Sequence, residues 1–166
     1  MKKNITLSAC VGLAICLAGC GKSSKKNESD GLSVPGSHIQ IVSIQNGGGL
    51  KDEGFKAAAD ALQSHPDIRG IFAINDPSAL GAHAALKQKA KVGQVTIVGF
   101  DGQLDGKQAI KDGWIFADPI QHPDQMGREI VKLIVKYQAG EDFDQEILIP
   151  ATLYDKAEAD TDPELK

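Results

Sequence analysis

The chain has 166 residues and a formal charge of −4, from 18 basic and 22 acidic side chains. This length suits one domain of ordinary size, and an apolar content of 42% is enough for a core. An acidic domain gains nothing by releasing counterions from DNA or RNA, so the composition argues against nucleic acid as a partner. All three cysteines lie within the first 20 residues, so no disulfide is expected in the folded part.

The first 19 residues have the pattern of a secretory leader. Lys2 and Lys3 precede an apolar run from about Leu7 to Ala18 that is too short to span a bilayer comfortably. The run ends Leu-Ala-Gly-Cys at Cys20, which resembles a bacterial lipobox. The resemblance implies lipidation of Cys20 and a protein held at the cell envelope, on the periplasmic or extracytoplasmic side of a membrane. The alternatives are a plain signal peptide and a short membrane anchor with a chance cysteine.

Residues 20–37 are rich in Ser, Gly and mixed charge, which predicts a flexible tether. Gly21-Lys22-Ser23 is not the end of a P-loop, because Cys16 stands where that motif needs its first glycine. We expect residues 38–155 to form the folded domain and the acidic residues 156–166 to form a frayed tail.

Helical and strand patterns alternate through the domain. Strands are predicted at 39–45, 71–74, 95–100, 114–117 and 146–149. Helices are predicted at 50–64, after Asp76, at 102–111 with Gly113 as a cap, and from Pro123 to a stop at Gly140. This alternation predicts an α/β fold with an open, mostly parallel sheet and flanking helices, and the uncharged runs suit strands buried on both faces.

Two local features admit more than one interpretation. Asp76 can cap the helix that follows it, with Pro77 in the first turn. The segment 46–49, Asn-Gly-Gly-Gly, could cradle a phosphate or form a loose turn. The turn is favoured, because the segment lacks both phosphate-loop spacing and a suitably placed basic residue.

Polar side chains follow three of the predicted strands, at Asn75, Asp101 and Gln121. Parallel strands place their carboxyl ends along one edge, where ligands bind in open α/β sheets. A carboxylate and two amides suit a polyhydroxylated ligand, and Phe100 or Trp114 could cover the apolar face of a sugar ring. The alternative is that these residues form turns only.

Several segments together resemble the C-terminal half of ribose-type periplasmic sugar-binding proteins. The matching segments are 72–76 (Phe-Ala-Ile-Asn-Asp), 79–82, 98–102 (Val-Gly-Phe-Asp-Gly), 121–127 and 65–68, within a region of about 39–160. The resemblance implies a partial type I periplasmic binding fold and a solute receptor that feeds an ABC permease. It also implies that Asn75, Asp101 and Gln121 contact sugar hydroxyls and that Phe100 lines the cleft.

The chain departs from that family pattern by passing from the tether almost directly to the middle of the second lobe. We therefore expect weakened sugar binding, and an apolar stripe on the 123–139 helix that packs elsewhere or stays partly exposed. The predicted function is a truncated, membrane-anchored sugar-binding component of an ABC importer. The alternative is a lipoprotein module that docks a permease, a sensor or a separate partner lobe. No enzyme activity, cofactor or metal is predicted, since the four histidines lack metal-ligand spacing and no nucleophile motif occurs.

Overall fold

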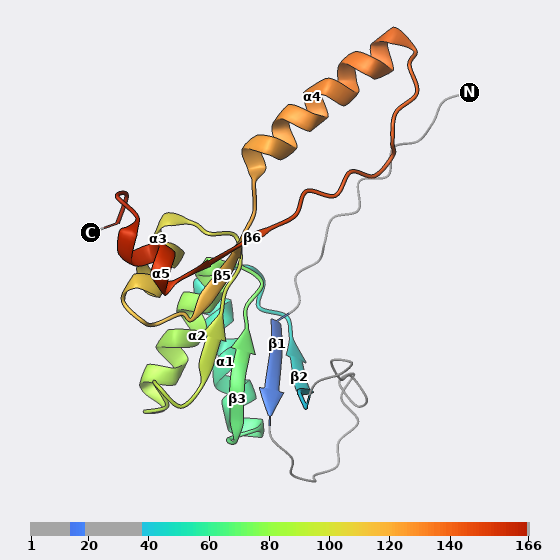
Figure 1. The fold of residues 1–166 in the computed structure, drawn as a ribbon. Coiled ribbons are helices and arrows are strands. Elements are labelled where there is room, and N and C mark those ends of the chain that lie inside the picture. The colour runs from blue at the N-terminus through green and yellow to red at the C-terminus, as the bar shows by residue number, and fades with distance from the viewer. Residues whose placement is uncertain (1–13, 19–37, 166) are drawn as a thin grey trace.

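A computed structural model describes residues 14–18 and 38–165 (Figure 1). The strands are β1 (Ala14–Ala18), β2 (Gln40–Gln45), β3 (Ile68–Phe72), β4 (Thr96–Val98), β5 (Ala117–Ile120) and β6 (Thr152–Asp155). The helices are α1 (Lys51–Ser64), α2 (Asp76–Gln88), α3 (Leu104–Lys111), α4 (Pro123–Ala139) and α5 (Lys156–Thr161). Cys20, the predicted tether and most of the predicted leader lie outside the described residues.

The six described strands form one open sheet in the order β2-β1-β3-β4-β5-β6. β2, β3, β4 and β5 run in the same direction, whereas β1 and β6 are antiparallel to their neighbours. The fold is therefore the predicted α/β class with a mixed, mostly parallel sheet and flanking helices. β1 lies between β2 and β3, although its residues belong to the predicted leader.

The sheet and helices share a single hydrophobic core. Ile71 and Ile97 from the sheet, Leu86 from α2 and Ile110 from α3 all belong to it. In Figure 1, α1 and α2 lie together behind the strands. Their backbones approach so closely that a Cβ on Gly81 would lie 2.1 Å from the Lys51 carbonyl oxygen. Gly81 is therefore required for α1 and α2 to pack at this distance.

The opposite face of the sheet is not covered by a helix within the described residues (Figure 1). Burial alternates along the strands accordingly. Ile71 and Ile97 are buried against the helices, while Phe72 and Val98 are only partly buried. The prediction that the central strands are buried on both faces is wrong for the described part of the chain.

Three predicted strand positions need correction. β3 begins three residues before the predicted strand, and β5 begins at Ala117, where the predicted strand ends. No strand forms at 146–149 in the described chain, because this extended segment has no neighbouring strand there to pair with.

The C-terminal segment is folded rather than frayed. Asp155 caps α5 by accepting from the Ala157 amide, and Glu158 completes a capping box. The Tyr154 hydroxyl donates to Asp162 Oδ2 at 2.8 Å, and Lys107 of α3 pairs with the same carboxylate at 3.4 Å. Ala159 is fully buried. The expectation of a frayed tail is therefore wrong for α5, which packs beside α3.

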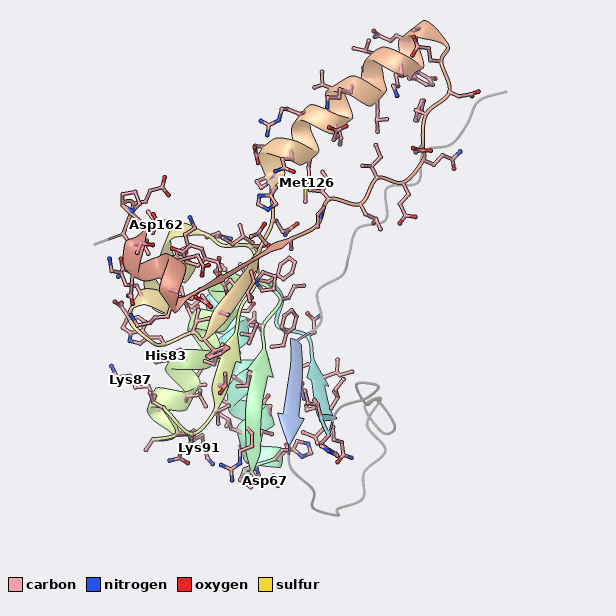
Figure 2. The ribbon with its side chains drawn as sticks, in the orientation of Figure 1. Asp67, His83, Lys87, Lys91, Met126 and Asp162 are labelled. Atoms are coloured by element: carbon pink, nitrogen blue, oxygen red, sulfur yellow. The ribbon has the colours of Figure 1, made fainter. Side chains whose placement is uncertain are left out.

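The helix α4 and the extended chain that returns to β6, residues 123–151, form what we call the α4 arm. Figure 1 shows the arm projecting away from the sheet, and Figure 2 shows Met126 at the end of α4 nearest the body. No residue of α4 is buried against the described part of the chain. Large apolar side chains along it are exposed: Ile130, Val131, Ile134, Val135 and Tyr137. Of the two outcomes expected for this stripe, exposure is the one observed.

Among the described residues, no helix is both long enough and apolar enough to cross a bilayer.

Candidate ligand-binding site

The carboxyl ends of β3, β4 and β5 lie next to one another, because these strands are parallel neighbours in the sheet. Asn75 follows β3, Asp101 follows β4 and Gln121 follows β5. An isolated parallel bridge between Asp101 and Ile120 extends the pairing beyond the two strand ends. The three predicted polar residues therefore share one edge of the sheet, which we call the rim.

Asp101 and Gln121 are in direct contact. The Gln121 Nε2 donates a hydrogen bond to Asp101 Oδ1, and the Gln121 amide donates to the Asp101 carbonyl oxygen at 3.3 Å. Asp101 has a φ of 98°, a left-handed conformation that costs a non-glycine residue about 1–3 kcal/mol. Such strained conformations cluster at functional sites, which makes Asp101 a candidate ligand-binding residue.

Asn75 is held firmly by the fold. Its Oδ1 accepts from the Ser78 amide at 3.0 Å and caps α2, and its Nδ2 donates to the Gly49 carbonyl oxygen at 2.9 Å. The sequence suggested Asp76 as the N-cap of this helix, but the N-cap in the structure is Asn75. An amide offers two donors and two acceptor lone pairs, so one of each stays free for a ligand.

The two candidate aromatic residues lie at opposite ends of the sheet. Phe100 follows β4 at the rim and packs edge-to-face on Phe72, with ring centroids 6.4 Å apart. Trp114 precedes β5 and stacks on His83 at 5.0 Å, at the amino ends of the strands. The suggestion that Trp114 covers a sugar ring at the rim is therefore wrong.

A pair of buried carboxyl groups lies beneath the rim and was not predicted from the sequence. Asp76 and Asp118 are both 0% exposed, and their side chains interact with each other. Burial, followed by the interaction with Asp118, raises the pKa of Asp76 to about 8, and burial also raises the pKa of Asp118. Asp76 Oδ1 and both Asp118 oxygens have no donor among the described residues. One proton shared between the carboxyls at neutral pH satisfies two of these atoms.

The carboxyl pair connects the rim segments to one another. The Gln103 amide, two residues after Asp101, donates to Asp76 Oδ2 at 2.6 Å. A Cβ on Gly106 would lie 2.2 Å from the Asp76 carboxyl carbon, and one on Gly99 would lie 2.3 Å from Asp118 Oδ1. Glycine at positions 106 and 99 therefore leaves the space that the Asp76 and Asp118 side chains occupy. The available sequence signal was an aspartate inside an apolar segment, Ala-Asp-Pro-Ile at 117–120.

The glycine-rich segment 46–49 forms a turn, in which the Gly48 amide donates to Asn46 Oδ1 at 3.0 Å. This agrees with the favoured interpretation of the segment. Through Gly49 the turn also supports Asn75.

A separate pocket of about 630 Å³ lies at the other ends of the strands. Its lining includes His83, Val92, Trp114, Phe116 and Lys156. Burial, and then the nearby Lys87 charge, lower the pKa of His83. Figure 2 shows His83 and Lys87 on the same side of the body. The described residues contain no cluster of three or more side chains able to hold a metal ion.

Comparison with known proteins agrees with this architecture. The periplasmic binding protein domain family matches residues 26–142, which is most of the chain. The chain therefore belongs to the periplasmic binding protein family.

Its relatives in this family include sugar receptors. The chain is 34% identical over 125 residues to the ribose import binding protein of Salmonella typhimurium, covering 75% of this chain and 42% of that protein. It is 38% identical over 100 residues to the D-apiose import binding protein of Paraburkholderia graminis, covering 60% of this chain and 32% of that protein. These relatives are import binding proteins and not enzymes, consistent with the absence of a predicted catalytic motif.

A solved structure also superimposes well. An ABC transporter solute-binding protein from Agrobacterium vitis with bound D-fucose has a TM-score of 0.66 and 31% identity, over 78% of this chain and 44% of that one. The chain spans about two fifths of the length of such relatives.

Proposed function

We propose that this chain is a sugar-binding component of an ABC importer for a ribose-like monosaccharide, and that the rim is its ligand site. The single observation that carries the proposal is the contact between Asp101 and Gln121 at the rim, in a chain that belongs to the periplasmic binding protein family. Relatives named for ribose and apiose import support the sugar class.

The rim offers the chemistry that a sugar needs. One oxygen of Asp101 is occupied by Gln121, which leaves the other to accept from ligand hydroxyls. Asn75 and Gln121 each retain donor and acceptor capacity, and we expect the Phe100 ring to meet an apolar ring face of the ligand. The buried carboxyl pair supports this set from below by holding the segment at Gln103.

We expect the affinity of this chain alone to be weak. One rim supplies about half of the hydrogen bonds that two closing lobes would supply. Each net hydrogen bond contributes roughly 0.5–1.5 kcal/mol, and about 1.4 kcal/mol corresponds to a factor of ten in Kd. The loss of several contacts therefore moves a micromolar ligand toward millimolar binding.

Isothermal titration with ribose, apiose, galactose, xylose and inositol tests the proposal. We expect binding of at least one sugar, abolished by Asp101→Ala and kept by Asp112→Ala. Asp112 is a matched control because it is an exposed aspartate at the far end of α3, where it accepts from Gln108. The proposal would be contradicted if none of the five ligands bound at millimolar concentration, or if both variants lost binding equally.

We also propose that Cys20 carries a lipid that holds the protein at the membrane surface. The lipobox-like sequence ending at Cys20 supports this. Membrane fractionation of the wild type and of Cys20→Ala, with the mass of the N-terminal peptide, tests it. A wild-type chain without lipid would rule out the anchor.

One observation favours a second candidate, a lipoprotein module that docks a permease, a sensor or a partner lobe. The exposed apolar stripe of the α4 arm has the character of a surface that another chain covers. Crosslinking from an α4 position in cells that express a neighbouring permease would support this candidate, and a chain that stays uncrosslinked would not.

A further inference from the structure

The position between β2 and β3 is interior to the sheet, and a segment from the predicted leader fills it. β1 pairs with β2 on one side and with β3 on the other. Cys16, for example, lies opposite Ser43 of β2 and Ile71 of β3. β1 is therefore an inner strand, on which the pairing of both neighbours depends.

β2 and β3 have no strand pairing with each other. They run in the same direction and are connected through α1, with one strand position between them. Neighbouring strands lie about 4.8 Å apart, so β2 and β3 are separated by roughly 9.6 Å, too far for backbone hydrogen bonds. Without a strand in this position, the inward-facing amides and carbonyls of both strands lose their partners.

The segment that fills this position fits it imperfectly. β1 runs antiparallel to both neighbours, whereas the order 2-1-3-4-5 of doubly wound sheets places a parallel strand there. Each of its two ladders also contains an irregularity. The register passes over Val42 of β2 between Cys16 and Leu17, and over Arg69 of β3 between Leu17 and Ala18.

A leader that is removed before Cys20 takes β1 with it. We infer that the position between β2 and β3 is an acceptor site for an extended, uncharged apolar strand donated by a partner polypeptide. Strand addition of this kind gains affinity from backbone hydrogen bonds and specificity from alternate side chains. The inference rests on the proposed lipidation of Cys20, with removal of the predicted leader before it, but not on sugar binding.

Two further surfaces point to a polypeptide partner and not to a small molecule. The uncovered face of the sheet leaves two side chains only partly buried: Phe72 of β3, directly beside the acceptor position, and Val98 of β4, one strand further along. The α4 arm exposes its apolar stripe. The relatives are more than twice as long as the part that this chain matches, so folds of this family contain further polypeptide able to cover such surfaces.

Hydrogen exchange on the full chain tests the inference. Leu17→Pro removes a ladder donor in the middle of β1, and Ser23→Pro in the predicted tether is the matched control. We expect at least a tenfold faster exchange of β2 amides in Leu17→Pro, with α2 still protected and Ser23→Pro unchanged. A synthetic peptide with the sequence of residues 12–19 should then restore the protection of β2, while the same peptide with proline at its Leu17 position should not.

Two results would overturn the inference: β2 protection that is unaffected by Leu17→Pro, or lost protection that the unsubstituted peptide does not restore. If Leu17→Pro does not fold, a protease site placed within residues 24–37 of the otherwise wild-type chain allows the strand to be cut free after folding. Uptake of a labelled 12–19 peptide in exchange for β1 supports an acceptor site, and no uptake refutes it.

A third experiment examines the predicted leader itself. Mass spectrometry of the protein from the cell envelope should show a chain that begins at Cys20. A chain that keeps residues 14–18 would fill its own sheet and would overturn the need for a partner. Sugar titration of the same samples separates the two proposals, because failure to bind sugar leaves these exchange results unchanged.

Discussion

The α/β body and the α4 arm have similar sequence patterns but different surroundings. In α2, apolar residues spaced along one side, such as Ala82 and Leu86, are buried in the common core. In α4, a longer apolar stripe that includes Ile130 and Ile134 has no described segment against it. An amphipathic pattern thus shows that a face will be buried, but not which part of which chain buries it.

The largest difference between the two regions should appear on truncating an isoleucine. Ile110→Ala in the core should lower the free energy of unfolding by about 3 kcal/mol, because it leaves a cavity around a fully buried side chain. Ile134→Ala on the exposed stripe should change it by less than about 0.5 kcal/mol. Urea denaturation measures both. Equal losses would show that α4 is packed in solution.

Glycine-to-alanine substitutions in α2 and α4 test the same difference between the body and the arm. Gly81→Ala places a Cβ against the Lys51 carbonyl oxygen and should cost about 1–3 kcal/mol. Gly127 of α4 has open space around it, so Gly127→Ala should raise the helix content of the arm and leave the melting of the body unchanged. Circular dichroism melts distinguish the two outcomes, and a stable Gly81→Ala would argue against the close packing of α1 on α2.

The buried carboxyl pair predicts a pH dependence confined to the body. Because the folded-state pKa of Asp76 is raised to about 8, the folded chain keeps a proton that the unfolded chain releases above pH 4. The contribution of Asp76 to stability is therefore complete below about pH 4 and declines as the pH rises toward 8. Asp76→Asn mimics the protonated form, so its stability relative to the wild type should rise over this interval, by at most about 1.4 kcal/mol for each pH unit.

The matched control is Asp124→Asn in α4. The pKa of Asp124 is lowered by its hydrogen bond to Arg128, and the side chain is exposed. We expect the difference between Asp124→Asn and the wild type to stay constant from pH 5 to pH 8. Denaturation at several pH values measures both variants. A difference between Asp76→Asn and the wild type that also stays constant would exclude the shared proton.

The smallest effect concerns two tyrosine hydroxyls. Tyr154→Phe removes the hydrogen bond to Asp162 that fastens α5 to the body, and should lower Tm by roughly 2–4 °C. Tyr137→Phe in the arm should not alter Tm, since this side chain is 63% exposed. A Tm for Tyr154→Phe that equals the wild-type value would indicate that α5 is not docked in solution.

Much of the body could be predicted from the sequence, because its signals are local. The α4 helix begins at Pro123 and ends at Gly140, whose φ of 73° gives the left-handed cap that the glycine indicated. The placement of Asn75, Asp101 and Gln121 at one edge follows from the parallel order of three strands. Their role as sugar ligands stays a prediction.

The failed predictions depended on contacts between distant segments. Residues 146–149, Glu-Ile-Leu-Ile, have the short apolar pattern of a strand, but a strand needs a neighbour to pair with. Asp118 follows the strand predicted at 114–117, whereas in the structure it lies inside β5 and contacts Asp76. The acidic tail is folded because Tyr154 and Lys107 both contact Asp162 at its end. No local sequence pattern connects these residues.

We propose that the body binds a sugar at the rim, without any contribution from the arm. Amide chemical shifts of the full chain, recorded by NMR during titration with ribose, are the most direct test of this proposal. We predict saturable shifts at Asn75, Asp101 and Gln121, with none at Ile134 of the arm. Shifts confined to the far pocket around His83 and Trp114, or no shifts at millimolar ribose, would contradict the claim.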